Sequence, residues 1–311
     1  MAIRHLLTLN DLTDKELLDI LDFADRIKKN PGQYATVLKD KTLLMIFAKP
    51  SLRTRLSFEV GMTQMGGHGI YYDLSTSPMG KKESIADTAR TAARYVDIVM
   101  ARLFGHEDIE EYAKYSNVPV INALTNFAHP CQIIADLQTI REKKKKLGGL
   151  KLAYCGDGNN NITHSLIEGC TKVGIDISVA CPRGKEVEPH DAVLGIGKKN
   201  AVRNKCKLVV THDAGEAVKG ADIVYTDSWM SYHLPKEKES ERIAVLTPYQ
   251  VNAELMKCAK PDAIFMNCLP AMRGYEQTVD VIDGPQSIVF DQAENRLHAQ
   301  KAIMLFLLGK R

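Results

Sequence analysis

Five polar segments follow apolar runs of the sequence, at the points where those runs would end as β-strands. They are Ser51–Arg55, Arg102, Gly156–Asn161, Asp227–Trp229 and Asn267–Pro270. In an open parallel sheet, ligands bind outside the carboxyl ends of the strands. These segments are therefore the first candidates for chemistry, together with the run from His129 to Gln132, which opens a long helical pattern.

The segment Ser51-Leu52-Arg53-Thr54-Arg55 has the chemistry of an oxyanion site. It lies where a strand gives way to a helix, so free backbone N–H groups point outward and the helix dipole favours an anion. The hydroxyls of Ser51 and Thr54 add donors, and the guanidinium of Arg53 matches the oxygens of a phosphate. An ordinary capped helix start would carry similar residues, so this segment alone leaves both interpretations open.

The glycine-rich segment Gly156–Asn161 begins like a dinucleotide fingerprint but does not complete it. Asn161 stands where the third glycine is required, and Cys181-Pro182 follows the next strand where an acidic residue belongs. We therefore do not expect NAD binding. The nine histidines lack metal-ligand spacing and the seven cysteines contain no CxxC pair, which argues against a zinc site and a disulfide framework. We expect no metal and a reducing compartment.

Length and composition are those of an ordinary globular protein of about two domains. The 311 residues are 45% hydrophobic and 25% charged, and Lys and Arg (41) nearly balance Asp and Glu (38). So small a net charge gives no electrostatic case for binding nucleic acid or a membrane surface. The apolar run Ala302–Leu308 falls far short of the ~20 residues that a membrane helix needs. We expect a cytoplasmic protein, and a removed organelle presequence stays an open alternative.

Strand and helix patterns alternate in two series, which predicts an α/β protein of two domains. Each domain would be a mainly parallel β-sheet flanked by helices, and long helices would join the two. We expect strands at 41–47, 70–73, 97–102, 119–122, 151–155, 176–181, 208–211, 223–226, 264–266 and 287–290. We expect the clearest helices at 14–29, 55–65, 85–95, 109–115, 129–146, 163–173 and 292–308. The first domain would span residues 1–140 and the second 141–291, and a helix within 292–311 would return to the first.

Several motifs, taken in order, resemble those of the aspartate/ornithine carbamoyltransferase family over nearly the full chain. They are FAKPSLRTRLSFE at 47–59, GKKESIADTAR at 80–90, HPCQIIAD at 129–136, the GD, NN and HSL elements between 156 and 166, and DGPQS with AENRLHAQKA between 283 and 302. The resemblance implies that the first domain binds carbamoyl phosphate and the second binds the amine. Within the family it implies transfer of the carbamoyl group to the side-chain amine of L-ornithine, giving L-citrulline and phosphate.

The same resemblance implies the cofactors, partners and site residues. No metal or organic cofactor would be needed, the substrates would be small molecules, and a homotrimer or a multiple of trimers would share active sites between neighbours. Ser51, the Leu52 backbone, Arg53 and Thr54 would hold the phosphate. The carbamoyl pocket would contain Arg102, His129, Gln132, Cys268, the Leu269 backbone and Arg296. Ornithine would be bound by Asn161, Asp227, Ser231, Tyr232 and Cys268, and the catalytic candidates are Arg102, His129, Cys268 and Asp227.

The implied reaction accounts for these residue types. An alkyl ammonium has a pKa of about 10.4, so a neutral amine at pH 7 costs roughly 4–5 kcal/mol unless the site desolvates it. The carbamoyl oxygen gains negative charge in the transition state, and Arg102, Thr54 and His129 would donate to it. Ser51 and Arg53 would stabilise the departing phosphate. Closure of the two domains would exclude water that hydrolyses carbamoyl phosphate.

Three positions depart from the family pattern. Asn267 replaces the histidine of His-Cys-Leu-Pro, Tyr232-His233 replaces Met-Gly after Ser231, and Pro78 stands where a Gln or His reaches into a neighbour's site. Pro78 has no side-chain donor, which bears on carbamoyl phosphate affinity, and Tyr232 bears on the choice of amine. Two alternatives therefore stay open. One is a sister enzyme that uses putrescine, an acylated ornithine or a shorter diamino acid, and the other is a non-catalytic ligand-binding relative.

Overall fold

The computed structural model describes residues 3–230, 237 and 239–310. Contacts divide the chain into two compact units: unit 1 is Met1–Gln138 with Glu294–Arg311, and unit 2 is Thr139–Ala293. Each unit holds one parallel β-sheet, so the predicted α/β class with two parallel-sheet domains is confirmed. The division falls within helix α5 (Pro130–Lys144) and within helix α12 (Val289–Leu307), which are the long joining helices that the sequence predicted.

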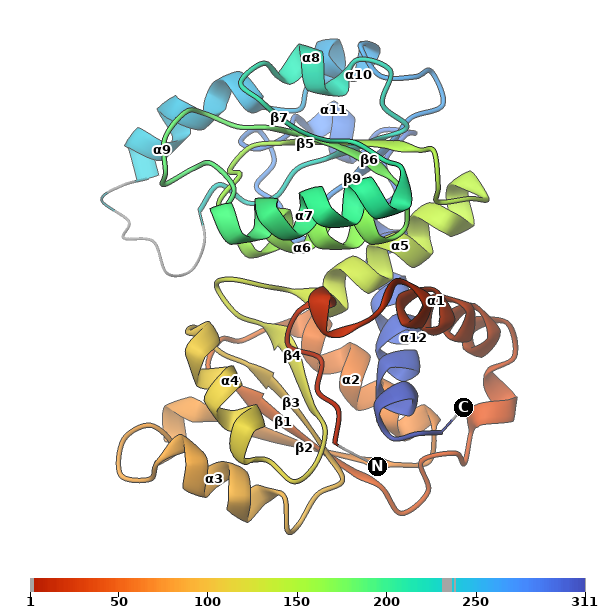
Figure 1. Ribbon diagram of the computed structural model, residues 1–311, viewed down its shortest axis with the longest axis vertical. Coiled ribbons are helices and arrows are strands. Elements are labelled where there is room, and N and C mark those ends of the chain that lie inside the picture. The colour runs from red at the N-terminus through yellow and green to blue at the C-terminus, as the bar shows by residue number, and fades with distance from the viewer. Residues whose placement is uncertain (1–2, 231–236, 238, 311) are drawn as a thin grey trace. The chain divides into compact units, whose positions relative to one another are not determined.

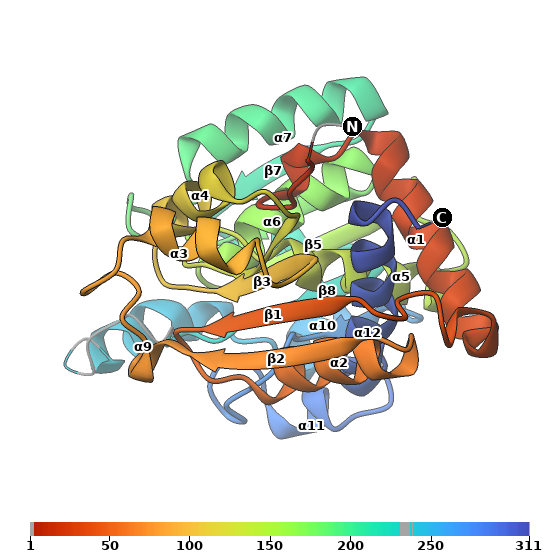
Figure 2. The ribbon, with the colours of Figure 1, turned by 90° about the horizontal axis from the view of Figure 1, so that it is seen from below.

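Unit 1 is built on a four-stranded sheet with the order β2-β1-β3-β4. Its strands are β1 (Thr42–Phe47), β2 (His68–Asp73), β3 (Ile98–Arg102) and β4 (Val120–Leu124), and its helices before α5 are α1 (Asp14–Lys29), α2 (Leu52–Gln64), α3 (Ile85–Ala92) and α4 (His106–Tyr115). Figure 2 shows β1 and β2 running side by side, as their parallel pairing requires. An apolar core between the sheet and helices α3 and α4 includes Ile46, Val99, Ile109 and Tyr112.

Local sequence signals account for the helix starts of unit 1. Thr13 and Glu16 form the capping box of α1, in which each side chain accepts a hydrogen bond from the other residue's backbone N–H. Ser51 caps α2 by accepting from the backbone N–H of Thr54. Because Ser51 follows β1 by only four residues, the short connection leaves the start of α2 near the carboxyl end of β1, where ligands bind in parallel sheets.

Unit 2 is built on a five-stranded sheet with the order β7-β6-β5-β8-β9. Its strands are β5 (Lys151–Cys155), β6 (Asp176–Ala180), β7 (Leu208–Thr211), β8 (Ile223–Tyr225) and β9 (Ile264–Met266). Its helices are α6 (Asn161–Lys172), α7 (Asp191–Asn204), α8 (Ala214–Val218), α9 (Glu239–Leu246), α10 (Ala253–Lys257) and α11 (Val279–Ile282). Figure 1 shows α6 and α7 on one face of this sheet and α8, α10 and α11 on the other.

One predicted strand is wrong and several helix ends are misplaced: the helices expected to begin at 55, 109 and 292 begin three residues earlier, at Leu52, His106 and Val289. The run 287–290 is not a strand: Ser287 makes only an isolated bridge to Phe265, and α12 already begins at Val289. A short apolar run such as this has no periodicity that separates a strand from a buried helix start. The helix expected at 85–95 ends at Ala92. Among the described residues, no helix is long and apolar enough to cross a membrane.

Candidate active site

The start of α2 gathers the residues expected to hold a phosphate. The hydroxyl of Ser51 accepts from the backbone N–H of Thr54 at 3.3 Å and donates to the hydroxyl of Thr54 at 3.1 Å. Thr54 is buried, Arg53 is half-buried and Leu52 is 71% exposed, so the backbone of this turn lies at the surface of unit 1. A helix start of this kind presents N–H groups and a positive dipole end to an anion.

The guanidinium of Arg296 ties α12 to α2 and α5 within unit 1. Its Nη1 donates to Oε1 of Gln132 at 2.6 Å, and its Nη2 donates to the hydroxyl of Thr54 at 3.3 Å. The other side of Gln132 donates to Asp136 at 2.8 Å. With its amide oxygen turned toward the guanidinium, Gln300 accepts from Nε of Arg296 at 3.0 Å. Three residues far apart in the sequence, Thr54, Gln132 and Arg296, are thus brought together, and each is at most 2% exposed.

His129 is a buried histidine surrounded by positive charge. Its carbonyl oxygen accepts from the N–H of Gln132, which places it at the start of α5. Burial, first, and then the charges of Arg296, Arg102 and Arg53 hold the pKa of His129 well below its ordinary value of 6.5. The imidazole is therefore neutral at physiological pH. A neutral imidazole carries one N–H donor and one acceptor, which suits donation to a carbonyl oxygen.

Lys49 is a further cation of this group that the sequence analysis did not single out. It is 4% exposed, its Nζ donates to Oδ1 of Asn126 at 2.7 Å, and the ammonium lies 4.3 Å from the centre of the Phe104 ring. Burial and the nearby charge of Arg102 lower the pKa of Lys49 to about 8. The available signal was a lysine that directly precedes the Pro-Ser-Leu-Arg-Thr run after a strand.

The two lowered pKa values have a common cause in unit 1. His129 and Lys49 each lose proton affinity partly because guanidinium groups lie near them. The cations of such a group repel one another while no anion is bound. A bound anion is attracted by all of them at once. A compact dianion such as the phosphate of carbamoyl phosphate is the ligand that this charge arrangement favours.

In unit 2, Asp227 and Cys268 form a direct pair although they are 41 positions apart. Asp227 follows β8 and Cys268 follows β9, and these strands pair in parallel, so their carboxyl ends meet. The thiol of Cys268 donates to Oδ1 of Asp227 at 3.0 Å. Both residues are half-buried. A carboxylate at a strand end is suited to bind an ammonium group through charge-assisted hydrogen bonds.

Asn267, one of the departures from the family pattern, holds the loop that carries Cys268. It is fully buried, its Oδ1 accepts from the N–H of Leu269 at 2.8 Å, and its Nδ2 donates to Gln277 at 3.0 Å. The Leu269-Pro270 peptide bond is cis, and Leu269 has a φ of 56°. Because Asn267 already accepts from the N–H of Leu269, the carbonyl oxygen is the Leu269 backbone group left for the predicted pocket.

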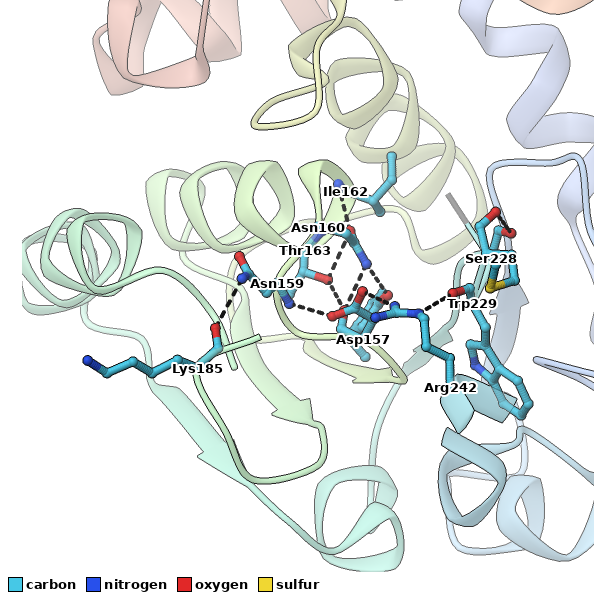
Figure 3. Close-up of polar contacts among 11 residues, drawn as sticks. Asp157, Asn159, Asn160, Ile162, Thr163, Lys185, Ser228, Trp229 and Arg242 are labelled. Atoms are coloured by element: carbon cyan, nitrogen blue, oxygen red, sulfur yellow. Dashed lines mark hydrogen bonds and ion pairs between the residues drawn. The ribbon is translucent and has the colours of Figure 1, made fainter. Parts of the chain in front are cut away.

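The loop after β5 prepares the start of α6, as Figure 3 shows. Asn160, not Asn161, is the buried cap: its Oδ1 accepts from the N–H groups of Ile162 and Thr163, both at 2.9 Å. Asn161 is the first helical residue and is only half-buried. A Cβ atom at Gly158 would lie 2.7 Å from the carbonyl oxygen of Val187, so no larger residue fits there.

Two predicted ornithine-binding residues, Ser231 and Tyr232, lie outside the described residues. The other predicted residues divide between the two units. Unit 1 holds Ser51, Leu52, Arg53, Thr54, Arg102, His129, Gln132 and Arg296, and unit 2 holds Asn161, Asp227, Cys268 and Leu269. Within residues 3–230, 237 and 239–310, no group of three or more His, Cys, Asp or Glu side chains could hold a metal ion.

Comparison with known proteins assigns both units to one family. The model "Aspartate/ornithine carbamoyltransferase, carbamoyl-P binding domain" matches residues 4–142, and the model of the Asp/Orn binding domain matches residues 148–307. An ornithine carbamoyltransferase of Thermococcus kodakarensis is 52% identical over 99% of this chain and 98% of its own length. One from Pyrococcus furiosus, named anabolic, is 49% identical over 99% and 98%.

Solved structures agree with the sequence comparison. The ornithine carbamoyltransferase from Pyrococcus furiosus superposes with a TM-score of 0.94 at 48% identity, covering 100% of this chain and 98% of that one. The ornithine transcarbamoylase from Giardia lamblia superposes with a TM-score of 0.92 at 42% identity, covering 100% of both chains.

Proposed function

The chain belongs to the aspartate/ornithine carbamoyltransferase family, and we propose that it transfers the carbamoyl group of carbamoyl phosphate to the side-chain amine of L-ornithine. The products are L-citrulline and phosphate. Unit 1 binds carbamoyl phosphate and unit 2 binds the amine. The observation that carries this proposal is the neutral His129 among the charges of Arg53, Arg102 and Arg296, because that arrangement calls for a phosphate dianion.

In the proposed reaction, the amine nitrogen attacks the carbamoyl carbon and the bond to the phosphate oxygen breaks. Negative charge develops first on the carbamoyl oxygen, to which Arg102, Thr54 and His129 donate. It then passes to the leaving phosphate, which Ser51, the Leu52 backbone and Arg53 stabilise. Gln132, Cys268, Leu269 and Arg296 complete the carbamoyl pocket.

The acceptor must arrive as a neutral amine, and Asp227 with Cys268 supplies the environment for this step. The hydrogen bond between the two side chains, at 3.0 Å, marks a point where an ammonium can replace the thiol as donor to the carboxylate. The carboxylate stabilises the ammonium form and so raises the pKa of the amine, while exclusion of water from the site acts in the opposite direction; the proton must leave the nitrogen before it attacks the carbamoyl carbon. Asn161 and Asp227, with Ser231, bind the amino-acid end of ornithine, and Tyr232 contacts its carbon chain.

We also propose a homotrimer, or a multiple of trimers, with active sites shared between neighbours. Pro78 stands where the family places a Gln or His that reaches into a neighbour's site, and it is exposed and has no side-chain donor. Its carbonyl oxygen accepts from the N–H groups of Lys81, Lys82 and Glu83, which orders the turn. Light scattering on the purified protein should give three times the chain mass or a multiple of it. The cytoplasmic location expected from the sequence stays a prediction.

The proposal is tested by product formation from carbamoyl phosphate with a panel of amines. L-ornithine, N-acetylornithine, 2,4-diaminobutyrate and putrescine are compared at equal concentration, with ureido product measured directly. We expect turnover of ornithine in clear preference to the others. Turnover of putrescine alone would select the sister-enzyme alternative, and no turnover of any amine would leave only a non-catalytic relative.

A further inference from the structure

Arg242 in α9 joins two loops of unit 2 with a single guanidinium group (Figure 3). Its Nη2 donates to Oδ2 of Asp157 at 2.6 Å, and its Nε donates to the carbonyl oxygen of Trp229 at 2.9 Å. Asp157 follows β5 and Trp229 follows β8, and these strands are neighbours in the sheet. Arg242 therefore fixes the loops after two adjacent strands, at the edge of the sheet where ligands bind.

The contact is shielded from water, unlike most ion pairs of this chain. The side chains of Arg242 and Asp157 are 13% and 7% exposed, whereas those of Lys257 and Glu254 are 69% and 80% exposed. Trp229 is itself 3% exposed. Two groups held in this way do not change partners readily, and removal of one takes from the other its charged partner in a largely buried environment.

On one side, hydrogen bonds to Asp157 fix the residues at the start of α6. Its carbonyl oxygen accepts from the hydroxyl of Thr163 at 3.0 Å and from Nδ2 of Asn160 at 2.8 Å, and its Oδ1 accepts from the N–H of Asn159 at 2.9 Å. Asn161 stands between these contacts as the first residue of the helix. Its backbone is therefore placed by residues that Arg242 holds through Asp157.

On the other side, the carbonyl oxygen of Trp229 fixes the chain two residues after Asp227. Asp227 is held from its other side by the thiol of Cys268. The carboxylate of Asp227 is thus held by Cys268 in the loop after β9, while the backbone two residues further on is held by Arg242 in α9. A lysine at position 242 has a single ammonium in place of the planar fork, so it cannot reproduce both directed bonds with the same geometry.

We propose that Arg242 is a positioning residue of the amine-acceptor site. By holding Asp157 and Trp229 together it fixes the spacing between Asn161 and Asp227, and so sets the geometry with which these two residues hold the amino-acid end of the acceptor. The inference rests on the proposed function, because that spacing matters only if the acceptor is bound at both residues. The competing explanation is that the ion pair serves only to stabilise unit 2.

Steady-state kinetics of Arg242→Met and Arg242→Lys separate these explanations. We expect the KM for ornithine to rise at least tenfold in Arg242→Met, with the KM for carbamoyl phosphate within twofold of the wild-type value. Arg242→Lys should recover part of this loss, because a lysine can still pair with Asp157. Lys260→Met is the matched control: it breaks the 2.7 Å ion pair to Asp222, which lies before β8, and should leave both KM values unchanged.

A lower melting temperature without a change in the ornithine KM would overturn the inference, and so would an equal rise of both KM values. If Arg242→Met does not fold, Arg242→Lys and Asp157→Asn carry the same comparison. The double variant Asp157→Asn/Arg242→Met should raise the ornithine KM no further than the worse single variant, because both remove one interaction. Wild-type protein that does not use ornithine would instead contradict the proposed function, and the inference would fall with it.

Discussion

The thiol of Cys268 donates to the carboxylate of Asp227 across the carboxyl ends of two paired strands, at 3.0 Å. We expect Asp227→Asn to raise the KM for ornithine by about ten- to a hundredfold, since a hydrogen bond to a charged group contributes roughly 1.5–3 kcal/mol. Carbamoyl phosphate affinity should stay unchanged. Asp222→Asn is the control, because Asp222 lies at the opposite end of β8; an equal effect from both variants would show that Asp227 acts only on stability.

Arg53 and Arg55 lie on the same helix and give opposite predictions. Arg53→Ala should weaken carbamoyl phosphate binding by at least about a hundredfold, because a fork that matches the phosphate oxygens is lost. Arg55 is exposed and pairs with Glu59, so Arg55→Ala should bind normally. Calorimetric titration measures both, and circular dichroism checks the fold. Undiminished affinity in Arg53→Ala would refute its assignment to the phosphate.

Lys49, with a pKa of about 8, should make carbamoyl phosphate affinity fall as the pH rises through that value. Deprotonation removes one cation from the group around the anion site. Lys49→Met should bind about tenfold more weakly at pH 7, the loss of one charge-assisted contact, and should lack this step between pH 7 and 9. Lys41→Met, at the start of β1, should keep the step. Titrations with carbamoyl phosphate at pH 7 and at pH 9 measure this step. A step of wild-type size in Lys49→Met would contradict the prediction.

Lys49 also affects the stability of the unliganded protein. Because folding lowers its pKa from 10.5 to about 8, the unfolded chain binds more protons than the folded chain between these values. Stability from this group therefore rises with pH across that window. At pH 7 the buried ammonium is a cost, so Lys49→Met should melt at a higher temperature than the wild type. A lower melting temperature would show that the bond to Asn126 outweighs burial.

Glu276 should give the opposite dependence on pH. Burial is the main cause that raises the pKa of Glu276 from 4.5 to about 7, and the nearby charge of Asp227 adds to it. The hydrogen bond from the N–H of Met272 lowers the pKa and so acts in the opposite direction. The folded state therefore holds an extra proton, and its stability contribution is lost as the pH rises from about 4.5 to 7. The loss amounts to as much as about 3 kcal/mol. Urea unfolding of Glu276→Gln at pH 5 and pH 8 should show a smaller difference than the wild type, whereas exposed Glu254→Gln should match it.

The sequence was most informative where chemistry and secondary structure coincide. Ser51 lies at a strand-to-helix junction, caps the helix and is the proposed phosphate donor, so pattern and motif predicted the same position. Lys49 was missed because a lysine after a strand is ordinarily solvated, and only packing against Phe104 and Asn126 reveals its burial. Arg242 was missed because its partners are 85 and 13 positions away, and no local pattern reports such distances.

The prediction failed where local patterns were short. The apolar residues at 288–290 fit a strand as well as a helix, and the choice was made by packing that the sequence does not display. Asn160 and Asn161 are neighbours of the same residue type, so the sequence pattern alone does not separate their roles. The structure separates them by burial. Asn160 is buried and its side chain caps α6, whereas Asn161 is half-exposed.

Unit 1 includes residues on both sides of unit 2, so its last segment, from Glu294, is made after unit 2. Domains fold as units during synthesis, so unit 2 can form its sheet while unit 1 still lacks that segment. Arg296 reaches Gln132 and Thr54 only after unit 2 has been synthesised. A chain that stops within unit 2 lacks this guanidinium, so the start of α2 and the start of α5 are made long before the residue that joins them.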